Sequence, residues 1–366
     1  MPLLRRGDRG EAVRDLQARL TALGYAIDPA ELGQFGPSTE RAVREFQQRR
    51  QLLVDGVVGH DTWQDLVEAG YTLGDRTLYL RSPYQRGDDV RELQRALNVL
   101  GFDAGREDGI FGERTDRAVR EFQRNVGLAP DGIVGATTIQ ALRRLRPVAP
   151  GPGRATVREM EALRRLSASL QGARIAIDPG HGPGDPGGVG PGGLTEAEAT
   201  LLLAHELALE LSRRGAAPFL LRDAHANPSV HDRARRANEL GPEVLVAIHL
   251  NSHEDPPTEG AATYYFGTER WHSVAGQRLA GAIQTELCAR LGLRDCGVHP
   301  KSIPILRETR MPAVQVEPCF VTNPREEALL RHPRFRRALA EAMAHGVERF
   351  FRGAAAQPGT SASGRG

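Results

Sequence analysis

The chain has 366 residues, 40% of them hydrophobic, and carries a formal net charge of +2 at pH 7. This length predicts two or three domains, and the near-neutral charge argues against nucleic acid or an anionic membrane as a partner. The three cysteines (Cys288, Cys296 and Cys319) are odd in number and irregularly spaced, so neither a disulfide framework nor a zinc knuckle is indicated. The sequence contains no apolar segment of signal-peptide or membrane-spanning length, so we expect a cytoplasmic protein with no membrane span. The alternative is that the protein is exported by a non-standard route.

The first half of the chain is a duplication. Residues 9–25 return as residues 86–102, and residues 35–66 return as residues 111–142, at offsets of 77 and 76 residues. In each copy apolar residues recur at helical spacing, an Asp-Gly turn follows the second such segment, and a third helix is expected to begin near Thr62 or Thr138. The pattern predicts two small repeats of three helices each, over residues 1–71 and 78–146.

Small helical repeats can read DNA, but the first 146 residues contain nearly equal numbers of arginine and acidic residues, which argues against it. The repeats resemble the peptidoglycan-binding domain found beside bacterial cell-wall hydrolases, on the patterns G-D…V…L-Q, F-G-x-x-T…A-V-x-x-F-Q and D-G-x-x-G-x-x-T. The resemblance implies peptidoglycan as a partner. The first copy has Leu32-Gly33-Gln34 where the second has Asp108-Gly109-Ile110, so we expect the first to bind less well. The alternative is that the repeats only pack against the rest of the protein.

The second half of the chain is predicted to form a separate domain that follows a linker. Residues 147–172 are predicted to be a proline- and glycine-rich linker with a short polar helix over 156–171, and residues 353–366 a disordered tail. Between them, strand-like runs alternate with amphipathic helices. Strands are expected at 174–178, 217–222, 244–250, 260–266, 303–307 and 313–317, and helices at 195–214, 229–240, 270–291 and 325–351. This alternation predicts an α/β domain over 173–352, with a mostly parallel sheet and helices on both faces.

A histidine lies in a glycine-rich loop directly after the first of these strands, in IAIDPGHGPGDPGG at residues 175–188. Gly182, Gly184 and Gly187 match G-x-G-x-x-G, but proline and glycine continue to about Thr195 and no helix can begin at once, so nucleotide binding is not favoured. His181 therefore lies at the carboxyl end of a strand, where α/β sheets usually bind ligands. A loop histidine without a function is the alternative.

Three further polar residues are expected near the same sheet edge. His249 ends the apolar strand VLVAIH, Glu317 ends AVQVE, and Glu196 begins the helix after the glycine loop. Taken singly, His249 could be satisfied by backbone groups and Glu196 could be an ordinary acid at a helix start, but Glu317 needs a cation or a proton. Two histidines and one carboxylate on separate segments form a plausible open zinc site, and a further glutamate nearby suits metal-assisted hydrolysis.

The domain resembles the zinc-dependent N-acetylmuramoyl-L-alanine amidases over almost all of residues 173–352. The matching segments are DPGHG (178–182), GLTE (193–196), AIHLN (247–251), LRETRMP (306–312) and VEPCFVTN (316–323). The resemblance implies that His181, Glu196 and His249 bind Zn²⁺, that Glu317 is the catalytic acid/base, and that the substrate is peptidoglycan or a muropeptide. Its G-L-x-E spacing selects Glu196 over the rival Glu198.

The resemblance also suggests roles for residues around the site. Arg307 is expected near the substrate, with a surface ion pair as the alternative, and Asn251 is expected to contact the substrate or to hold the His249 loop. Cys319 could face the site but is favoured as an inert buried thiol. The double-repeat layout also resembles CwlM-type amidase relatives, which implies an alternative function: a cytoplasmic regulator or sensor of peptidoglycan precursor synthesis, with an enzyme of that synthesis as its partner.

Overall fold

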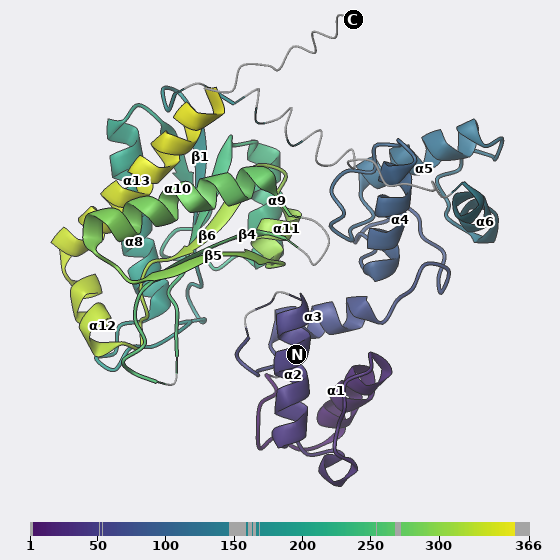
Figure 1. Cartoon of the computed structure of the whole chain (residues 1–366), viewed down its shortest axis with the longest axis horizontal. Helices are drawn as coiled ribbons and strands as arrows, with labels where there is room; N and C mark the ends of the chain where they lie inside the picture. The colour runs from purple at the N-terminus through teal and green to yellow at the C-terminus, as the bar shows by residue number, and fades with distance from the viewer. Residues whose placement is uncertain are drawn as a thin grey trace, which may run out of the picture. The chain divides into compact units, whose positions relative to one another are not determined.

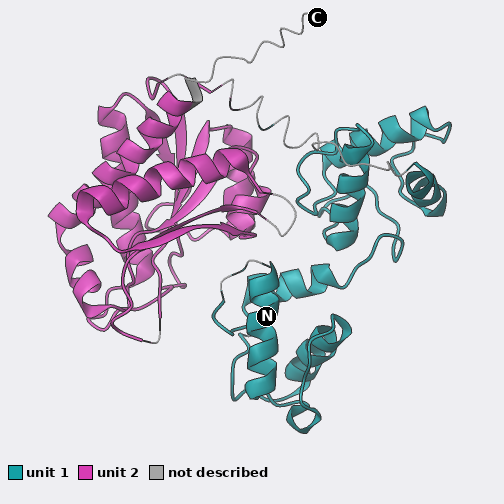
Figure 2. Cartoon of the chain, in the orientation of Figure 1, with its two compact units in different colours: residues 1–159 teal, residues 160–366 magenta. Residues whose placement is uncertain are grey.

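The protein consists of two compact units, residues 1–159 and residues 160–366 (Figure 2). A computed structural model describes residues 3–50, 52, 54–145, 159, 163, 166–167, 169–253, 255–267 and 272–355. Most of the predicted linker and the tail from residue 356 lie outside the described residues. In the predicted linker helix over 156–171, residues 159 and 163 are helical, whereas residues 166–167 and 169–171 are not. Residues 353–355, predicted to begin the disordered tail, instead end the last described helix. No helix in the described part of the chain combines the length and the hydropathy that a membrane crossing needs.

The first unit confirms the predicted pair of three-helix repeats. The first repeat contains α1 (Glu11–Ala22), α2 (Pro37–Arg50) and α3 (His60–Ala69), and the second contains α4 (Asp88–Val99), α5 (Glu113–Asn125) and α6 (Ala136–Arg144). A short 3₁₀ helix, η1 (Pro29–Glu31), precedes α2 in the first repeat. Each repeat buries an apolar core of its own around a pair of phenylalanines: Phe35 and Phe46 in the first, Phe111 and Phe122 in the second.

Buried glutamines hold the turns between the helices of the repeats. The side-chain amide of Gln123 on α5 donates to the Asp131 carboxylate at 2.8 Å, to the Ile133 carbonyl at 3.0 Å and to Thr138 Oγ1 at 3.2 Å. Its amide oxygen accepts from the backbone N–H of Gly132 at 2.9 Å. Gln47 makes the equivalent four bonds in the first repeat. Each Asp-Gly turn of the sequence pattern is thus closed by one neutral side chain that both donates and accepts.

A second glutamine in each repeat does the same for the turn before α2 or α5, and here the copies differ. Gln94 donates to the Asp108 carboxylate at 2.8 Å, and that carboxylate also accepts from the Ile110 N–H at 2.9 Å. In the first repeat the position of Asp108 is taken by Leu32, whose side chain is 66% exposed, and Gln17 donates to the Glu31 carbonyl at 2.9 Å instead. The first copy therefore keeps the turn but lacks the carboxylate.

The second unit is built on a six-stranded sheet in the order β2-β1-β3-β6-β4-β5. Its strands are β1 (Arg174–Pro179), β2 (Ala217–Leu220), β3 (Val244–Ile248), β4 (Ala261–Phe266), β5 (Asp295–Lys301) and β6 (Ala313–Glu317). Neighbouring strands pair in parallel except at one position, where β4 runs antiparallel to β6. The predicted mostly parallel sheet is confirmed.

Helices cover both faces of this sheet, as predicted (Figure 1). One face packs against α8 (Glu196–Arg213), α10 (Val274–Leu291) and α13 (Pro333–Ala355), and its core includes Ile175, Val246 and Val314. The other face packs against α9 (Val230–Leu240) and α11 (Pro304–Glu308), and its core includes Ala176 and Leu245. Successive strand residues point to opposite faces, so the interior strand β3, which is buried on both sides, is apolar along its whole length.

The predicted elements of this unit differ from the structure in three places. The run at 303–307, predicted to be a strand, is the helix α11, because Pro304 occupies its first turn, where proline is well tolerated. The strand β5 was not predicted, since its sequence DCGVHPK contains glycine, proline and charged residues; it lies at the sheet edge, where proline is allowed. The predicted helix 325–351 is interrupted at His332, between α12 (Pro324–Arg331) and α13, because Pro333 begins a new helix.

Candidate metal centre

Four of the residues predicted to form a site come from the carboxyl edge of three neighbouring parallel strands and from one helix. His181 follows β1, His249 follows β3, and Glu317 is the last residue of β6, while Glu196 is the first residue of α8. Because β1, β3 and β6 are adjacent and parallel, their carboxyl ends lie side by side. The topology therefore explains how residues more than 130 positions apart along the chain reach one edge.

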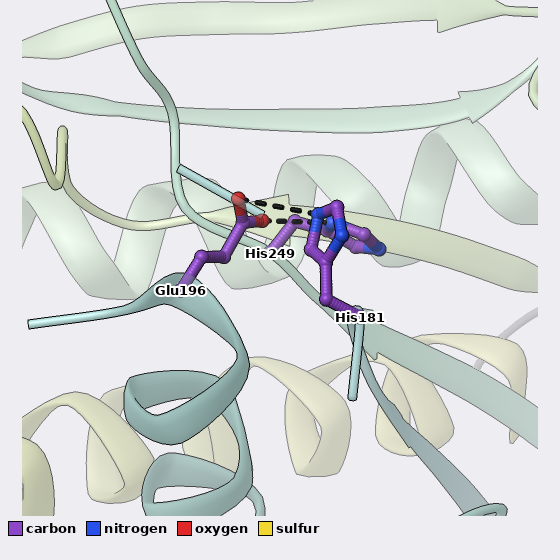
Figure 3. A group of neighbouring side chains, drawn as sticks. All are labelled: His181, Glu196 and His249. Atoms are coloured by element: carbon purple, nitrogen blue, oxygen red, sulfur yellow. Dashed lines mark hydrogen bonds and ion pairs between the residues drawn. The ribbon is translucent and has the colours of Figure 1, made fainter. Parts of the chain in front are cut away.

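His181, Glu196 and His249 form a compact cluster (Figure 3). The two oxygens of the Glu196 carboxylate face different histidines: Oε2 lies 3.2 Å from His181 Nε2, and Oε1 lies 2.9 Å from His249 Nδ1. One potential ligand atom from each residue lies within 4.8 Å of the others. The carboxylate is further fixed by the N–H groups of Leu250 and Gly188, each 2.9 Å from one of its oxygens. Two imidazoles and one carboxylate at this spacing fit the ligand set of a zinc ion that keeps an open position.

Glycines make room for these side chains. A methyl group added at Gly180 would lie 2.5 Å from Cε1 of His249, and one added at Gly187 would lie 2.6 Å from Cδ2 of His181 and 2.7 Å from Oε2 of Glu196. Gly187 also has a left-handed φ of 65°. His181 itself has a φ of 58°. It is the only non-glycine residue with a positive φ in the described part of the chain. The loop is therefore shaped around the two imidazole rings.

The cluster is strongly coupled electrostatically. Burial works to lower the pKa of His181, but hydrogen bonds and charges from Glu196 and Asp185 outweigh it and raise this pKa to about 9. Burial works to raise the pKa of Glu196, but the two histidines overcome it and hold this pKa far below its usual range. Without a metal, the cluster thus keeps a proton on His181 at neutral pH. A bound metal ion would take the place of that positive charge.

Glu317 is buried beside this cluster and has an oxygen that is not hydrogen bonded within the described structure. Its Oε1 accepts from the side-chain amide of Gln315 at 2.9 Å, whereas Oε2 is buried without a partner there. Burial raises the pKa of Glu317, against the opposing effects of the Gln315 hydrogen bond and the charge of His249. A buried carboxyl group with a raised pKa and a free oxygen is suited to accept and return a proton.

The other predicted site residues lie in less direct positions. Asn251 joins the His249 loop to the segment after β6: its N–H donates to the Cys319 carbonyl, and its own carbonyl accepts from Val321, both at 2.8 Å. Arg307 is 2% exposed on α11, with its guanidinium 3.6 Å from the carboxylate of Glu308, so its expected contact with substrate stays a prediction. Glu198, the rival of Glu196, is exposed. Cys319 is fully buried in the apolar core.

Sequence reasoning missed three residues that support the site. Asp185 accepts from Nδ1 of His181 at 2.9 Å, which directs Nε2 toward Glu196. Arg222 and Arg233 are 3% and 5% exposed and donate to backbone carbonyls of the His181 loop. Arg222 lies just beyond the end of β2, at the same sheet edge as the histidines, and that position was the one available signal.

Comparisons with known proteins agree with this division of the chain. A family model described as N-acetylmuramoyl-L-alanine amidase matches residues 175–349, and a model of a peptidoglycan binding domain matches residues 9–66 and 86–142. The chain is 40% identical over 363 residues to N-acetylmuramoyl-L-alanine amidase CwlM of Mycobacterium tuberculosis, covering 95% of this chain and 89% of that protein. It is 32% identical over 188 residues to N-acetylmuramoyl-L-alanine amidase LytC of Bacillus subtilis, covering 51% and 37% of the two chains.

Among solved structures, an N-acetylmuramoyl-L-alanine amidase from Clostridium difficile 630 matches with 30% identity and a TM-score of 0.46. This match covers 48% of this chain and 95% of that chain.

Proposed function

Because this chain belongs to the N-acetylmuramoyl-L-alanine amidase family, we propose that it hydrolyses the amide between the lactyl group of N-acetylmuramic acid and L-alanine of the stem peptide, in a zinc-dependent reaction. The observation that carries this proposal is the meeting of the His181, Glu196 and His249 cluster with the buried Glu317 at one edge of the sheet. We assign catalysis to residues 173–352, and glycan binding to the repeats at 1–71 and 78–146.

In this proposal each residue of the site has a separate task. His181, Glu196 and His249 hold Zn²⁺, which when bound polarises the scissile carbonyl and makes water a better nucleophile. Glu317 accepts a proton from the attacking water through Oε2, the oxygen left without a partner in the described structure. It then delivers that proton to the nitrogen of the leaving L-alanine. The C–N bond breaks, a C–O bond forms, and the products are a lactyl carboxylate and a free amine.

The second candidate is a regulator or sensor of peptidoglycan precursor synthesis, in which the same fold mainly binds a muropeptide and contacts an enzyme of that pathway. Its support is the double-repeat layout of this chain and the match to CwlM of Mycobacterium tuberculosis, which covers 95% of this chain and 89% of that protein. All four residues of the catalytic set are present, however, and an inactive binding domain does not need Glu317. We therefore favour the hydrolase.

The test uses the purified full-length protein. We expect about one zinc ion per chain by metal analysis, since one such ligand cluster lies in the described part of the chain, and we expect its loss in His181→Ala and His249→Ala. Glu317→Gln should keep the zinc and the melting temperature but lose turnover on purified muropeptides by about 100- to 10,000-fold, as read by mass spectrometry.

Two outcomes would decide between the candidates. Cleavage products from the wild type that disappear in Glu317→Gln support the hydrolase. A zinc-loaded wild type that binds muropeptides and leaves all of them intact would overturn the hydrolase and favour the regulator.

A further inference from the structure

We propose that Arg222 and Arg233 are positioning residues of the metal centre, which hold the His181 loop and the first turn of α8 so that His181 and Glu196 face the same point. This inference rests on the proposed function, since it concerns how the chain prepares its zinc ligands. Neither arginine is hydrogen bonded to a side chain of the cluster. Both act through the backbone that carries it.

Arg233 on α9 lies beneath the loop and uses every one of its N–H donors. It is 5% exposed. Its five hydrogen bonds run to the carbonyls of Pro228 (2.9 Å), Pro179 (2.6 Å) and His181 (2.6 Å), to Oδ1 of Asp178 (3.0 Å) and to Oδ1 of Asn227 (2.7 Å). A guanidinium has five donors in one plane, so a fully bonded one fixes the relative positions of all its acceptors.

Arg222 connects the loop to the helix that carries Glu196. Its Nε donates to the Pro179 carbonyl at 2.8 Å, and its Nη2 donates to the carbonyls of Gly180 at 2.9 Å and Ala197 at 2.8 Å. Ala197 is the neighbour of Glu196 in the first turn of α8. One guanidinium thus links the backbone beside one ligand to the backbone beside another, although the two ligands lie on different elements.

The two arginines together take the carbonyls of three consecutive residues, 179, 180 and 181. This matters because His181 holds a left-handed φ of 58°, a conformation that a non-glycine residue keeps only when its surroundings impose it. With the carbonyls fixed on the arginine side, the imidazole is presented to Glu196 and His249. A lysine ammonium has three donors that rotate together and no planar fork. It keeps the positive charge but cannot fix three backbone carbonyls in the geometry that a guanidinium imposes.

The experiment compares Arg222→Lys and Arg233→Lys with a matched control, Arg214→Lys. Arg214 is also an internally bonded arginine, but it pairs with Glu210 and Glu348 beyond the far end of α8 from Glu196. Zinc affinity of the full-length protein is measured by competition with a chromophoric chelator. The absorption spectrum of the Co²⁺-substituted protein reports the ligand geometry, and thermal unfolding of the metal-free protein reports the fold.

We expect Arg222→Lys and Arg233→Lys to bind zinc about 10- to 100-fold more weakly, with an altered Co²⁺ spectrum and a lower kcat at saturating zinc but an unchanged KM. Arg214→Lys should leave the zinc affinity, the Co²⁺ spectrum and kcat unchanged. Should Arg222→Lys fail to fold, Arg233→Lys alone tests the inference. Should Arg233→Lys fail to fold, Asn227→Ala replaces it, because Asn227 is exposed and its loss removes one acceptor of Arg233. That variant should weaken zinc binding several-fold in the same direction.

The failure of this inference can be told apart from the failure of the proposed function. A wild type that binds no zinc overturns the proposed function and this inference with it. A wild type that binds zinc, with folded arginine variants that match it in zinc affinity and Co²⁺ spectrum, overturns the positioning role alone.

Discussion

Glycine turns in the two units of this protein are held by buried side chains of different chemistry. In the repeats, Gln47 and Gln123 each close an Asp-Gly turn by donating to one of its carbonyls and accepting from its glycine N–H. In the catalytic unit, Arg222 and Arg233 donate to successive carbonyls of the His181 loop. The same structural task is performed by a neutral amide in one unit and by guanidinium groups in the other.

The choice between glutamine and arginine follows from the hydrogen-bonding groups that each turn leaves to be satisfied. A glutamine both donates and accepts, so it satisfies both kinds of backbone group and closes the turn on itself. An arginine only donates, so it takes the carbonyls and leaves the opposite side of the loop for the His181 imidazole. The turns of the repeats therefore only connect helices, whereas the turn of the catalytic unit presents the imidazole of His181 to Glu196. Substituting equivalent positions in the two units should separate these roles.

The largest effect is expected from replacing one glycine in each unit. Gly187 and Gly132 both have a left-handed φ, of 65° and 74°, so alanine should cost roughly 1–2 kcal/mol of stability in each. A methyl group at Gly187 also collides with His181 and Glu196, whereas at Gly132 it meets the flexible ends of Asp116 and Arg120. We expect Gly187→Ala to weaken zinc binding by roughly 100-fold or more.

Gly132→Ala should bind zinc like the wild type, as measured by chelator competition on the full chain. Equal zinc affinities in the two variants would show that the loop around Gly187 is not shaped for its ligands, and the comparison would fail.

The second prediction concerns how the stability of each unit changes with pH in the metal-free protein. The folded pKa of His181, about 9, lies above its ordinary value of 6.5, so its contribution is complete below pH 6.5 and is lost as the pH rises through 9. In the repeats, the backbone N–H of Ile133 and the side chain of Gln123 lower the pKa of Asp131, so its contribution is present above its ordinary value of 3.8 and is lost only on acidification.

Between pH 6.5 and 9 the catalytic unit should therefore become less stable without metal, while the repeats do not change. Calorimetry of the chelator-treated protein measures both transitions, and His181→Ala should remove the trend in the catalytic unit. With zinc added the trend should reverse, since zinc binds the deprotonated imidazole. A parallel shift of both transitions in the wild type would contradict the assignment.

The smallest effect is expected from adding one carboxylate to the first repeat. Leu32→Asp gives the first copy the carboxylate that Asp108 provides in the second, where it accepts from Gln94 and from the Ile110 N–H. We expect a gain of about 0.5–1 kcal/mol in the stability of the first repeat, and a loss of about 1–3 kcal/mol from the reverse change, Asp108→Leu. Urea denaturation measures both. A gain from Asp108→Leu would mean that the carboxylate does not support its turn.

The sequence was sufficient to predict the helical repeats, where a motif occurs twice, and the candidate residues that lie at the ends of strands. The duplication predicted both helical repeats. His181, His249 and Glu317 were selected as candidates because each lies at or just after the end of a predicted strand. The helix α11 was missed because Ile303 to Leu306 is too short an apolar run to distinguish a strand from a helix. Arg222 and Arg233 were missed because arginine is usually exposed, and only their contacts reveal that both are buried.

The position of β6 has a consequence for how the domain is made. It is the last strand in the chain, yet it lies in the interior of the sheet, between β3 and β4. During synthesis the strands before it can emerge, but β2-β1-β3 and β4-β5 cannot join into one sheet until β6 is inserted between them.

Since β6 also carries Glu317, the residue proposed for proton transfer is made with the strand that joins the two parts of the sheet. An unfinished chain can thus contain His181, Glu196 and His249 while lacking both the joined sheet and the carboxyl group of Glu317. Under the role proposed for Glu317, a chain that ends before β6 has no group for proton transfer and should not cut a substrate.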